Sequence, residues 1–476
     1  LQKHESEDSV MSITQNSIKQ HEIAALHELE QMMLAAKENI EESRSELEKS
    51  VTNLENCLQQ IRQKYILDEK QCAMEAFREQ FESGYTWING FLRNVERFGN
   101  REALAEPESG QVWTYTQLNA EANRFAHALL RSGLQKGDVV MAQLHNCPEF
   151  VFAYLACHKI GLVFCPVNFR LSAKELSGCM DNSCPKVFLM ESENQENTDM
   201  ALEWAKHAPE IILSTDSQSE HSYEKFADGC PETNPELPWD MYVFDETLRL
   251  FTSGTTGRQK SVCLTSINEV LSAHDVMINF PLSFTDRTMN TTPWFHRGGL
   301  HSGGITPTLY AGGTVVVQRK FQAEQTLDYI EQQGLTFVIG VPNVLELMAE
   351  AQQKHPRNLH SLHGIVTMGS PLERADCIRY QKILTQRIFN GYGTTETFWN
   401  TFLRPDDLPE NAGSAGRACV DDDVRIVKLY DDHIAEPNDL AARNGNEVGE
   451  VIIRSDAKSA AFYFGNPEET AKRFHN

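Results

Sequence analysis

Residues 251–261, with the sequence FTSGTTGRQKS, bring hydroxyl side chains, glycines and a lysine into one short segment. Gly254 and Gly257 allow backbone conformations in which successive N–H groups turn toward one anion. The hydroxyl groups add hydrogen-bond donors, and the ammonium group of Lys260 adds a positive charge. This combination predicts a loop that binds phosphate.

Two other interpretations of the segment are a Ser/Thr/Gly surface turn and the P-loop of nucleoside triphosphatases. A P-loop has a glycine directly before its lysine, and Gln259 stands there, so that interpretation fails. Composition alone would favour the surface turn. The flanks argue against it, because TLRLFTSG at 247–254 has the pattern of a strand and VCLTSINEVLSAHDVMINF at 262–280 that of a helix. Both ends of the loop would then be held in place.

Further segments that combine glycines with hydroxyl or charged side chains follow along the chain. They are TTPWFHRGG at 291–299, TMGSPL at 367–372, NGYGTTET at 390–397 and EVGEVIIRS at 447–455. Together with the loop, and in this order, they resemble the adenylate-forming superfamily, which includes acyl-CoA and aryl-CoA ligases, luciferases and the adenylation domains of peptide synthetases. The resemblance covers about residues 77–476. Gln259 and Ser261 depart from the proline and glycine that are usual in the family's phosphate loop.

The resemblance implies a role for each matching residue. Lys260, with Thr255 and Thr256, would contact the β- and γ-phosphates of ATP, and Thr395 would hydrogen-bond the α-phosphate. His296 would lie beside the carboxylate and the thiol tunnel. The predicted catalytic residues are Lys260, His296, Thr395 and Glu396, of which Glu396 would bind Mg²⁺. The predicted nucleotide-binding residues, with Tyr392 stacked on adenine, are Thr252, Ser253, Gly254, Thr255, Thr256, Gly257, Lys260, Gly369, Ser370, Pro371, Asn390, Gly391, Tyr392, Gly393, Thr394 and Thr395.

The implied activity is that of an ATP- and Mg²⁺-dependent carboxylic acid:CoA ligase that works through an acyl-adenylate. Peptide-synthetase domains carry an aspartate near the start of the segment at 291–299, whereas Trp294 and Phe295 stand there, so a fatty or other uncharged acyl acid is expected. Two alternatives stay open. One is a ligase that transfers the acyl group to a carrier protein, and the other is a non-catalytic nucleotide-binding scaffold.

Charge and cysteine content limit the other partners. The formal net charge of −24 disfavours binding to nucleic acid, so anionic ligands would depend on local cations such as Lys260, Arg258, Arg297 and Arg417. The 11 cysteines form no C-x-x-C pair and no metal-ligand spacing, which predicts reduced thiols in a cytoplasmic enzyme without a structural metal. No apolar run is long enough to span a membrane.

The first 83 residues contain neither glycine nor proline, which predicts a long helical region. Apolar residues recur every seven positions as Leu26, Met33, Ile40, Leu47, Leu54 and Ile61, with a second row of Val51, Leu58 and Tyr65. A helical hairpin and a short coiled coil both fit, and either would allow oligomerisation. The alternative is a lone helix packed on the rest of the chain.

The remaining chain predicts an α/β fold, because short apolar strands alternate with amphipathic helices. The resemblance implies two helix-covered, mostly parallel sheets followed by a small distorted β-barrel subdomain. The expected division is 1–75 for the helical extension, 76–403 for the α/β subdomains and 404–476 for the barrel-like part. A mobile C-terminal domain that supplies a lysine for adenylation follows in the family. Its motifs do not occur before Asn476, so we expect this sequence to bind ATP but to ligate poorly.

Overall fold

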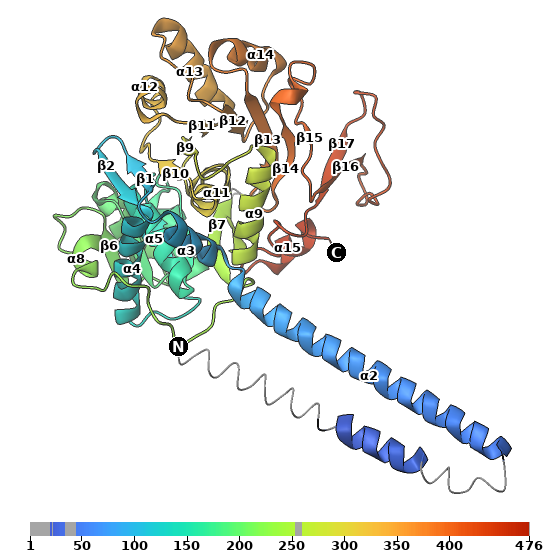
Figure 1. Ribbon diagram of the computed structural model, residues 1–476. Coiled ribbons are helices and arrows are strands. Elements are labelled where there is room, and N and C mark those ends of the chain that lie inside the picture. The colour runs from blue at the N-terminus through green and yellow to red at the C-terminus, as the bar shows by residue number, and fades with distance from the viewer. Residues whose placement is uncertain (1–19, 21, 34–43, 253–258, 476) are drawn as a thin grey trace. The chain divides into compact units, whose positions relative to one another are not determined.

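The computed structural model describes residues 20, 22–33, 44–252 and 259–475 (Figure 1). Contacts within the chain divide it into two units, Leu1–Gln80 and Phe81–Asn476. The domain boundaries expected after residues 75 and 403 stay predictions.

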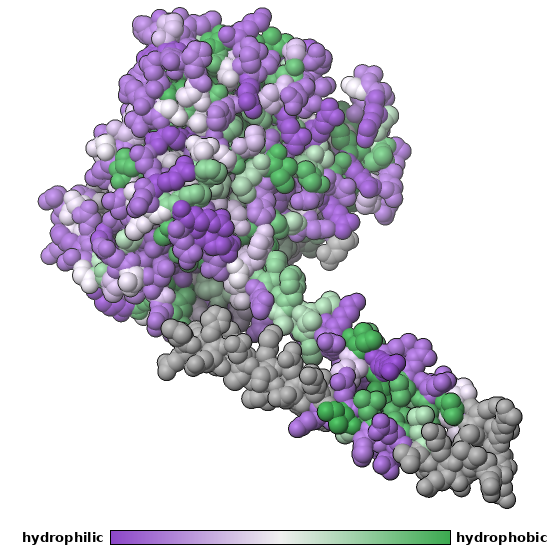
Figure 2. All heavy atoms as spheres, viewed as in Figure 1, coloured by the Kyte–Doolittle hydropathy of each residue, from purple (hydrophilic) through white to green (hydrophobic). Residues whose placement is uncertain are grey.

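The first unit is helical wherever it is described, with a helix over 22–33 and most of α2 (Arg44–Gly84). Leu26, Met33 and Ile61 of the predicted seven-residue row are exposed, while Leu54 is half-buried and Ile40 lies outside the described residues. Figure 2 shows hydrophobic side chains on the surface of this unit. The helical prediction is therefore confirmed, and the coiled coil stays a prediction.

A six-stranded sheet forms the first half of the second unit, in the order β6-β5-β3-β4-β7-β8. All neighbours are parallel except β7 and β8. The strands are β3 (Val139–Gln143), β4 (Val163–Pro166), β5 (Val187–Met190), β6 (Ile211–Ser214), β7 (Glu246–Thr252) and β8 (Lys260–Thr265).

Helices cover both faces of this sheet, which explains why every residue of β3, β4 and β5 is buried. Val140 and Ala142 pack with α4 and α5 on one face, and Val139 and Met141 pack with α6 on the other. The helices of this half are α3 (Trp87–Phe98), α4 (Tyr115–Arg131), α5 (Pro148–Ile160), α6 (Ala173–Ser183), α7 (Gln195–Trp204) and α8 (Tyr223–Ala227).

A nine-stranded sheet of order β15-β14-β13-β12-β11-β9-β10-β1-β2 forms the second half. Its interior pairs from β1 through β13 are parallel, and β2, β14 and β15 pair antiparallel. The strands are β1 (Glu102–Glu106), β2 (Gln111–Thr114), β9 (Arg287–Asn290), β10 (Thr314–Val316), β11 (Phe337–Gly340), β12 (Gly364–Met368), β13 (Ile388–Thr394), β14 (Phe398–Leu403) and β15 (Arg417–Ala418).

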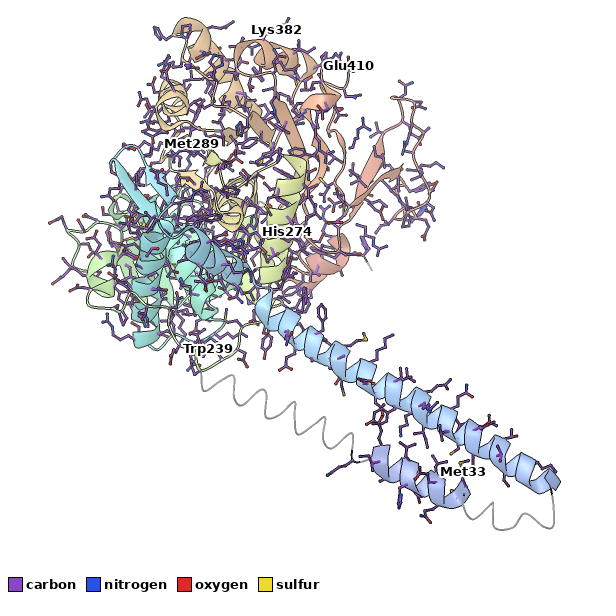
Figure 3. The ribbon with its side chains drawn as sticks, viewed as in Figure 1. Met33, Trp239, His274, Met289, Lys382 and Glu410 are labelled. Carbon is purple, nitrogen blue, oxygen red and sulfur yellow. The ribbon has the colours of Figure 1, made fainter. Side chains whose placement is uncertain are left out.

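This sheet is also covered by helices on both faces. Met289, Val338 and Ile365 pack with α12, α13 and α14, whereas Phe337 and Val366 pack with α9. Met289 lies in the interior, while Lys382 and Glu410 lie at the surface (Figure 3). The helices are α9 (Ser266–Asn279), α10 (Arg297–His301), α11 (Ile305–Ala311), α12 (Ala323–Gln333), α13 (Pro342–Lys354) and α14 (Arg374–Ile383).

After residue 404 the described elements are short. β16 (Asp423–Lys428) and β17 (Gly449–Arg454) form a two-stranded antiparallel sheet, and α15 (Pro467–Arg473) follows. The two mostly parallel, helix-covered sheets agree with the predicted α/β fold. In the part of the chain that the structure describes, no helix is both long and apolar enough to cross a bilayer.

Candidate functional site

Thr252 and Lys260 stand opposite each other, because they close the antiparallel pair of β7 and β8. The predicted phosphate-binding residues Ser253, Gly254, Thr255, Thr256 and Gly257, together with Arg258, connect these two positions and lie outside the described residues. One part of the sequence prediction is wrong here. The segment after the loop first forms β8, and α9 begins only at Ser266. The reason is that Val262 and Leu264 are buried in the sheet.

The two departures from the family pattern are both anchored to α6. The Gln259 side-chain oxygen accepts a hydrogen bond from the Cys179 thiol at 2.9 Å. The Ser261 hydroxyl donates to Asn182 Oδ1 at 2.6 Å. These bonds attach the start of β8 to its neighbouring helix, so Gln259 and Ser261 give this end of the loop a fixed position.

Lys260 is buried, with 7% of its surface exposed. Its ammonium group forms an ion pair with Glu469 on α15 and lies 5.2 Å from the centre of the Tyr463 ring. A cation next to an aromatic face and a carboxylate is held firmly. The structure therefore gives Lys260 an acidic partner that the sequence does not reveal, and the contact of Lys260 with phosphate stays a prediction.

Glu396 meets the same tyrosine. The Tyr463 hydroxyl donates to Glu396 Oε1 at 2.5 Å, and the Ala460 N–H donates to the Glu396 carbonyl oxygen at 2.8 Å. Burial, followed by this bond to Glu396, raises the pKa of Tyr463, so the phenol stays a donor. Tyr463 thus brings the predicted phosphate-binding lysine and the predicted metal-binding carboxylate to one place.

Tyr463 and Glu469 were missed in the sequence analysis. The sequence does contain a signal for the start of a helix, because Asn466 is followed by Pro467 and Glu469. In the structure the Asn466 side chain accepts a hydrogen bond from the Glu469 N–H at 3.2 Å. That signal predicts α15, but not its contact with Lys260.

The predicted adenine-binding residues come together at the ends of two neighbouring strands. β12 and β13 are parallel, with Thr367 opposite Asn390 and Met368 opposite Gly391. Gly369, Ser370 and Pro371 follow β12, so they lie next to the end of β13, which carries Tyr392, Gly393 and Thr394. Crevices at the carboxyl ends of parallel strands are the usual ligand sites of such sheets.

Two side chains at this edge are suited to bind a nucleobase. Tyr392 has 39% of its surface exposed, so its ring is available for stacking. Asn390 is buried, and its side-chain oxygen has no hydrogen-bond partner among the described residues. A buried acceptor without a partner costs free energy, and an amino group of a base would satisfy it.

Thr395 is tied to the segment that carries His296. Arg297 donates from Nη1 to the Thr395 carbonyl oxygen at 2.7 Å and from Nη2 to the Lys458 carbonyl oxygen at 2.7 Å. Burial lowers the pKa of Arg297 to about 9. The Arg297 guanidinium is turned to protein carbonyl oxygens, which argues against the ligand-binding role expected for it, whereas Arg417 is exposed and pairs with Asp407.

His296 precedes α10 and keeps part of its ring open to solvent. Its ring centre lies 4.1 Å from that of Phe295, and Phe295 contacts Phe169 at 5.6 Å. Partial burial lowers the pKa of His296 below its ordinary value, which favours the neutral imidazole. The next residue, Arg297, donates to the Thr395 carbonyl oxygen, so the backbone segments that carry the two predicted catalytic residues are joined by one hydrogen bond.

One further group of side chains has the spacing of metal ligands. It consists of His145, Glu191 and Glu193, which follow β3 and β5. Arg319 forms ion pairs with both carboxylates, and the His145 ring lies 2.6 Å from Glu191. Arg319 together with Lys320, which lies 4.0 Å from Glu193, offsets the charge of the two carboxylates, so we assign the cluster to structural ion pairing.

The family described as AMP-binding enzyme matches residues 91–463. An indoleacetate–CoA ligase of Aromatoleum aromaticum is 31% identical over 380 residues, which cover 79% of this chain and 71% of that protein. A fatty acid–[acyl-carrier-protein] ligase of Streptomyces coeruleorubidus is 28% identical over 366 residues, or 76% of this chain and 68% of that protein.

Solved structures share the fold. ATP-bound MatB from Rhodopseudomonas palustris superposes with a TM-score of 0.71 at 23% identity, over 82% of this chain and 74% of its own. The N-terminal domain of FACL13 from Mycobacterium tuberculosis gives a TM-score of 0.71 at 24% identity, over 82% of this chain and 94% of its own.

Proposed function

The chain belongs to the AMP-binding enzyme family, and from this we propose that it is an ATP-dependent acid–thiol ligase that works through an acyl-adenylate. The observation that carries this proposal is the position of Tyr463, whose ring faces the Lys260 ammonium and whose hydroxyl binds Glu396. A cation and a carboxylate thus meet at one point of the chain. These are the two kinds of charge that a triphosphate and its metal ion require.

In the proposed first step, an oxygen of the carboxylic acid attacks the α-phosphorus of ATP and pyrophosphate leaves. Lys260 would neutralise the leaving phosphates, and Thr395 would hydrogen-bond the α-phosphate. Tyr392 would stack on the adenine, and Asn390 would accept a hydrogen bond from the adenine amino group. Bound Mg²⁺ would offset phosphate charge, with Glu396 as a ligand, because Mg²⁺ prefers carboxylate oxygens.

The ion pair between Lys260 and Glu469 sets a condition for this step. When the phosphates bind, the Lys260 ammonium group has to leave the Glu469 carboxylate or contact the carboxylate and the phosphates together. Both partners are anionic, so the exchange keeps Lys260 neutralised throughout. We therefore propose that α15 holds Lys260 ready for the nucleotide and competes with it at the same time.

In the second step, a thiol would attack the acyl-adenylate and AMP would leave, with neutral His296 beside the reacting carbonyl. Coenzyme A is the acceptor that we favour, because curated relatives include indoleacetate–CoA ligase and feruloyl-CoA synthase. A carrier-protein thiol is the alternative that the Streptomyces coeruleorubidus relative supports. Trp294 and Phe295 are buried in the segment before His296, which supports an uncharged acyl or aryl acid as substrate.

Pyrophosphate release with a panel of acids tests the first step. The panel should contain indole-3-acetate, ferulate and saturated fatty acids of increasing length, with phenylalanine as a charged control. We expect ATP-dependent release with at least one uncharged acid and none with phenylalanine. Adding coenzyme A or a carrier protein that bears its free thiol then identifies the thiol acceptor. ATP binding without release for any acid would favour a nucleotide-binding scaffold.

We also propose that the helices of the first unit mediate self-association, because their described apolar side chains include the exposed Leu26, Met33, Ile61 and Met74. Deletion of residues 1–70 should lower the number of protomers per particle, obtained by light scattering as the particle mass divided by the mass of one chain, and leave pyrophosphate release unchanged. An unchanged number of protomers would reject this role.

A further inference from the structure

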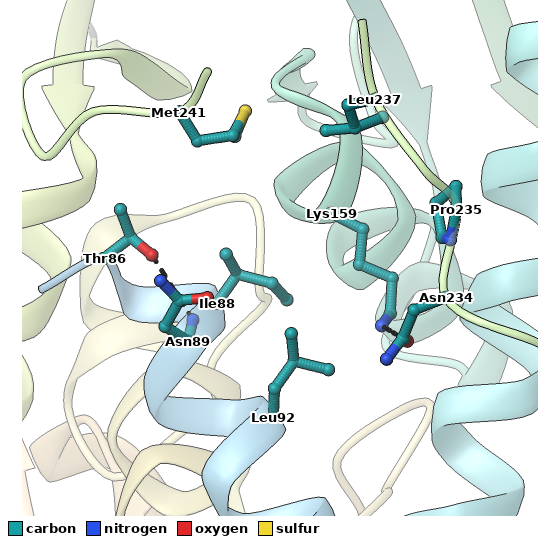
Figure 4. A pocket seen from close by; sticks show the side chains of 9 residues that line it. All are labelled: Thr86, Ile88, Asn89, Leu92, Lys159, Asn234, Pro235, Leu237 and Met241. Atoms are coloured by element: carbon teal, nitrogen blue, oxygen red, sulfur yellow. Dashed lines mark hydrogen bonds between the residues drawn. The ribbon is translucent and has the colours of Figure 1, made fainter. Parts of the chain in front are cut away.

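A cavity of about 180 Å³ lies among α3, the end of α5 and the segment 234–241 (Figure 4). Its walls are largely apolar, formed by side chains that include Ile88, Leu92, Leu237 and Met241. The volume corresponds to about six water molecules, which is room for a small organic molecule. None of the residues that line it belongs to the proposed ligase site.

Lys159 is the only charged side chain in the wall of this cavity. In Figure 4 it runs along the wall, with its amine directed toward Asn234. Nζ donates to Asn234 Oδ1 at 2.9 Å and to Asn119 Oδ1 at 2.7 Å. Both acceptors are neutral amides, and the described residues include no carboxylate that forms an ion pair with Lys159.

Two neighbouring charged groups are paired elsewhere. His158, the preceding residue on α5, pairs with Glu269. The Lys136 and Met241 side chains both lie next to Gly161, and Lys136 pairs with Asp245. Lys159 has only 7% of its surface exposed. A cation that is buried without a counter-ion is costly, because amide oxygens only partly replace its hydration. Burial accordingly lowers the pKa of Lys159 to about 7.

We propose that this cavity binds a small organic monocarboxylate, which pairs with Lys159 and places a short aliphatic tail against Ile88, Leu92 and Leu237. A single negative charge matches the single cation of the wall. The apolar walls suit a hydrocarbon tail and disfavour inorganic phosphate, because phosphate would bring several unsatisfied oxygens. The two asparagines fix the amine in place, so little side-chain entropy is lost when the ligand binds. This site goes beyond the proposed function, which does not use Lys159.

The direct test is isothermal titration of the full chain with pentanoate at pH 8. Lys159 is mostly neutral at this pH, so pairing with a carboxylate requires that the amine take up a proton. Titrations in two buffers of different ionisation enthalpy should therefore show an uptake approaching one proton per ligand. Lys159→Met should weaken binding at least tenfold and remove the uptake. Inorganic phosphate should not compete.

Two matched variants separate this cavity from other sites. Lys136→Met removes a neighbouring lysine that already has a carboxylate partner, and it should leave pentanoate binding unchanged. Lys260→Met alters the proposed ligase site and should also leave it unchanged. Leu92→Trp keeps Lys159 but fills the space for the tail, and it should abolish binding even if Lys159→Met were poorly folded.

Three results would overturn the proposal. They are equal pentanoate affinity in Lys159→Met and the unmodified protein, loss of binding in Lys260→Met, and absence of measurable binding to the unmodified protein at millimolar pentanoate. Loss of binding in Lys260→Met would assign the ligand to the ligase site and leave the proposed function standing.

Discussion

Lys260 and Lys159 are equally buried, with 7% of the surface of each exposed, but they differ in their partners. Lys260 pairs with the carboxylate of Glu469 and lies against the Tyr463 ring. Lys159 has two neutral amide oxygens, the face of the Phe91 ring at 6.0 Å and an adjoining cavity, but no carboxylate partner among the described residues. A buried lysine with an anionic partner can exchange that partner for a phosphate at little electrostatic cost. A buried lysine without one gains most from any anion that fits beside it.

The largest expected effect is on the rate of pyrophosphate release when Lys260 and Lys159 are each replaced by methionine. Lys260→Met should lower the rate of pyrophosphate release by about a hundredfold, because one donor to the leaving phosphates is lost. Lys159→Met should release pyrophosphate at the original rate, since the proposed chemistry does not involve it. Initial rates at saturating ATP measure both, and circular dichroism checks the fold. Equal rates for Lys260→Met and the unmodified protein would remove the lysine from the mechanism.

The second effect is on stability. Burial lowers the pKa of Lys159 to about 7 in the folded protein, whereas an unfolded lysine keeps its usual value of about 10.4. Between pH 7 and pH 9 the unfolded chain therefore holds a proton that the folded chain releases, so stability rises with pH in this window. The unfolding free energy should increase by about 2 kcal/mol from this residue.

Denaturant titrations at pH 7 and pH 9 measure this change. Lys159→Met should lack that part of the increase, and Lys136→Met should retain it. The same slope in the Lys159→Met variant and the unmodified protein would mean that Lys159 is not desolvated as the structure indicates.

A smaller effect is expected on the Mg²⁺ requirement when Glu396, which contacts Tyr463 as Lys260 does, is replaced. Glu396→Gln should raise the Mg²⁺ concentration needed for half-maximal pyrophosphate release by about tenfold, because an anionic oxygen is lost without a change in size. Tyr463→Phe keeps the carboxylate and removes only its hydrogen bond, so its Mg²⁺ requirement should change less. If both variants titrate with Mg²⁺ like the unmodified protein, Glu396 is not the metal ligand.

The smallest effect concerns the competition between Glu469 and ATP for Lys260. Glu469→Gln should tighten ATP binding by about threefold, because the ion pair between Glu469 and Lys260 no longer has to be broken. Lys472→Gln is the matched control, because Lys472 contacts the same carboxylate at 3.2 Å from the exposed side of α15. The measurement is the equilibrium affinity for ATP of both variants and of the unmodified protein. Weaker binding in Glu469→Gln would show that Glu469 positions Lys260 rather than competing for it.

Several features could be predicted from the sequence because they depend on local pattern. Strands such as VVMAQ and VFCP are buried on both faces, and their continuous apolar runs predict parallel sheets between helices. The order of the segments at 251–261, 291–299, 367–372 and 390–397 predicts the family, which the match over residues 91–463 confirms. The helix expected from Val262 onward was wrong in its first part, because only Thr265 and Ser266 separate the apolar residues of β8 from those of α9 and periodicity does not distinguish the two elements.

Other features are decided only by tertiary structure. Lys260 and Glu469 are separated by 209 residues, and no local pattern relates them. Arg297 has the same charge as Lys260 but is turned inward to backbone carbonyl oxygens, so sequence could not show which of the two is available to a ligand. Lys159 lies in the last turn of the apolar helix α5. Its hydrogen-bond partners are neutral because α4 contributes Asn119 and the segment after α8 contributes Asn234. Residue type determined which charges this protein has. Packing between distant segments determined which of them are paired, because an ion pair depends on distances that only the folded chain sets.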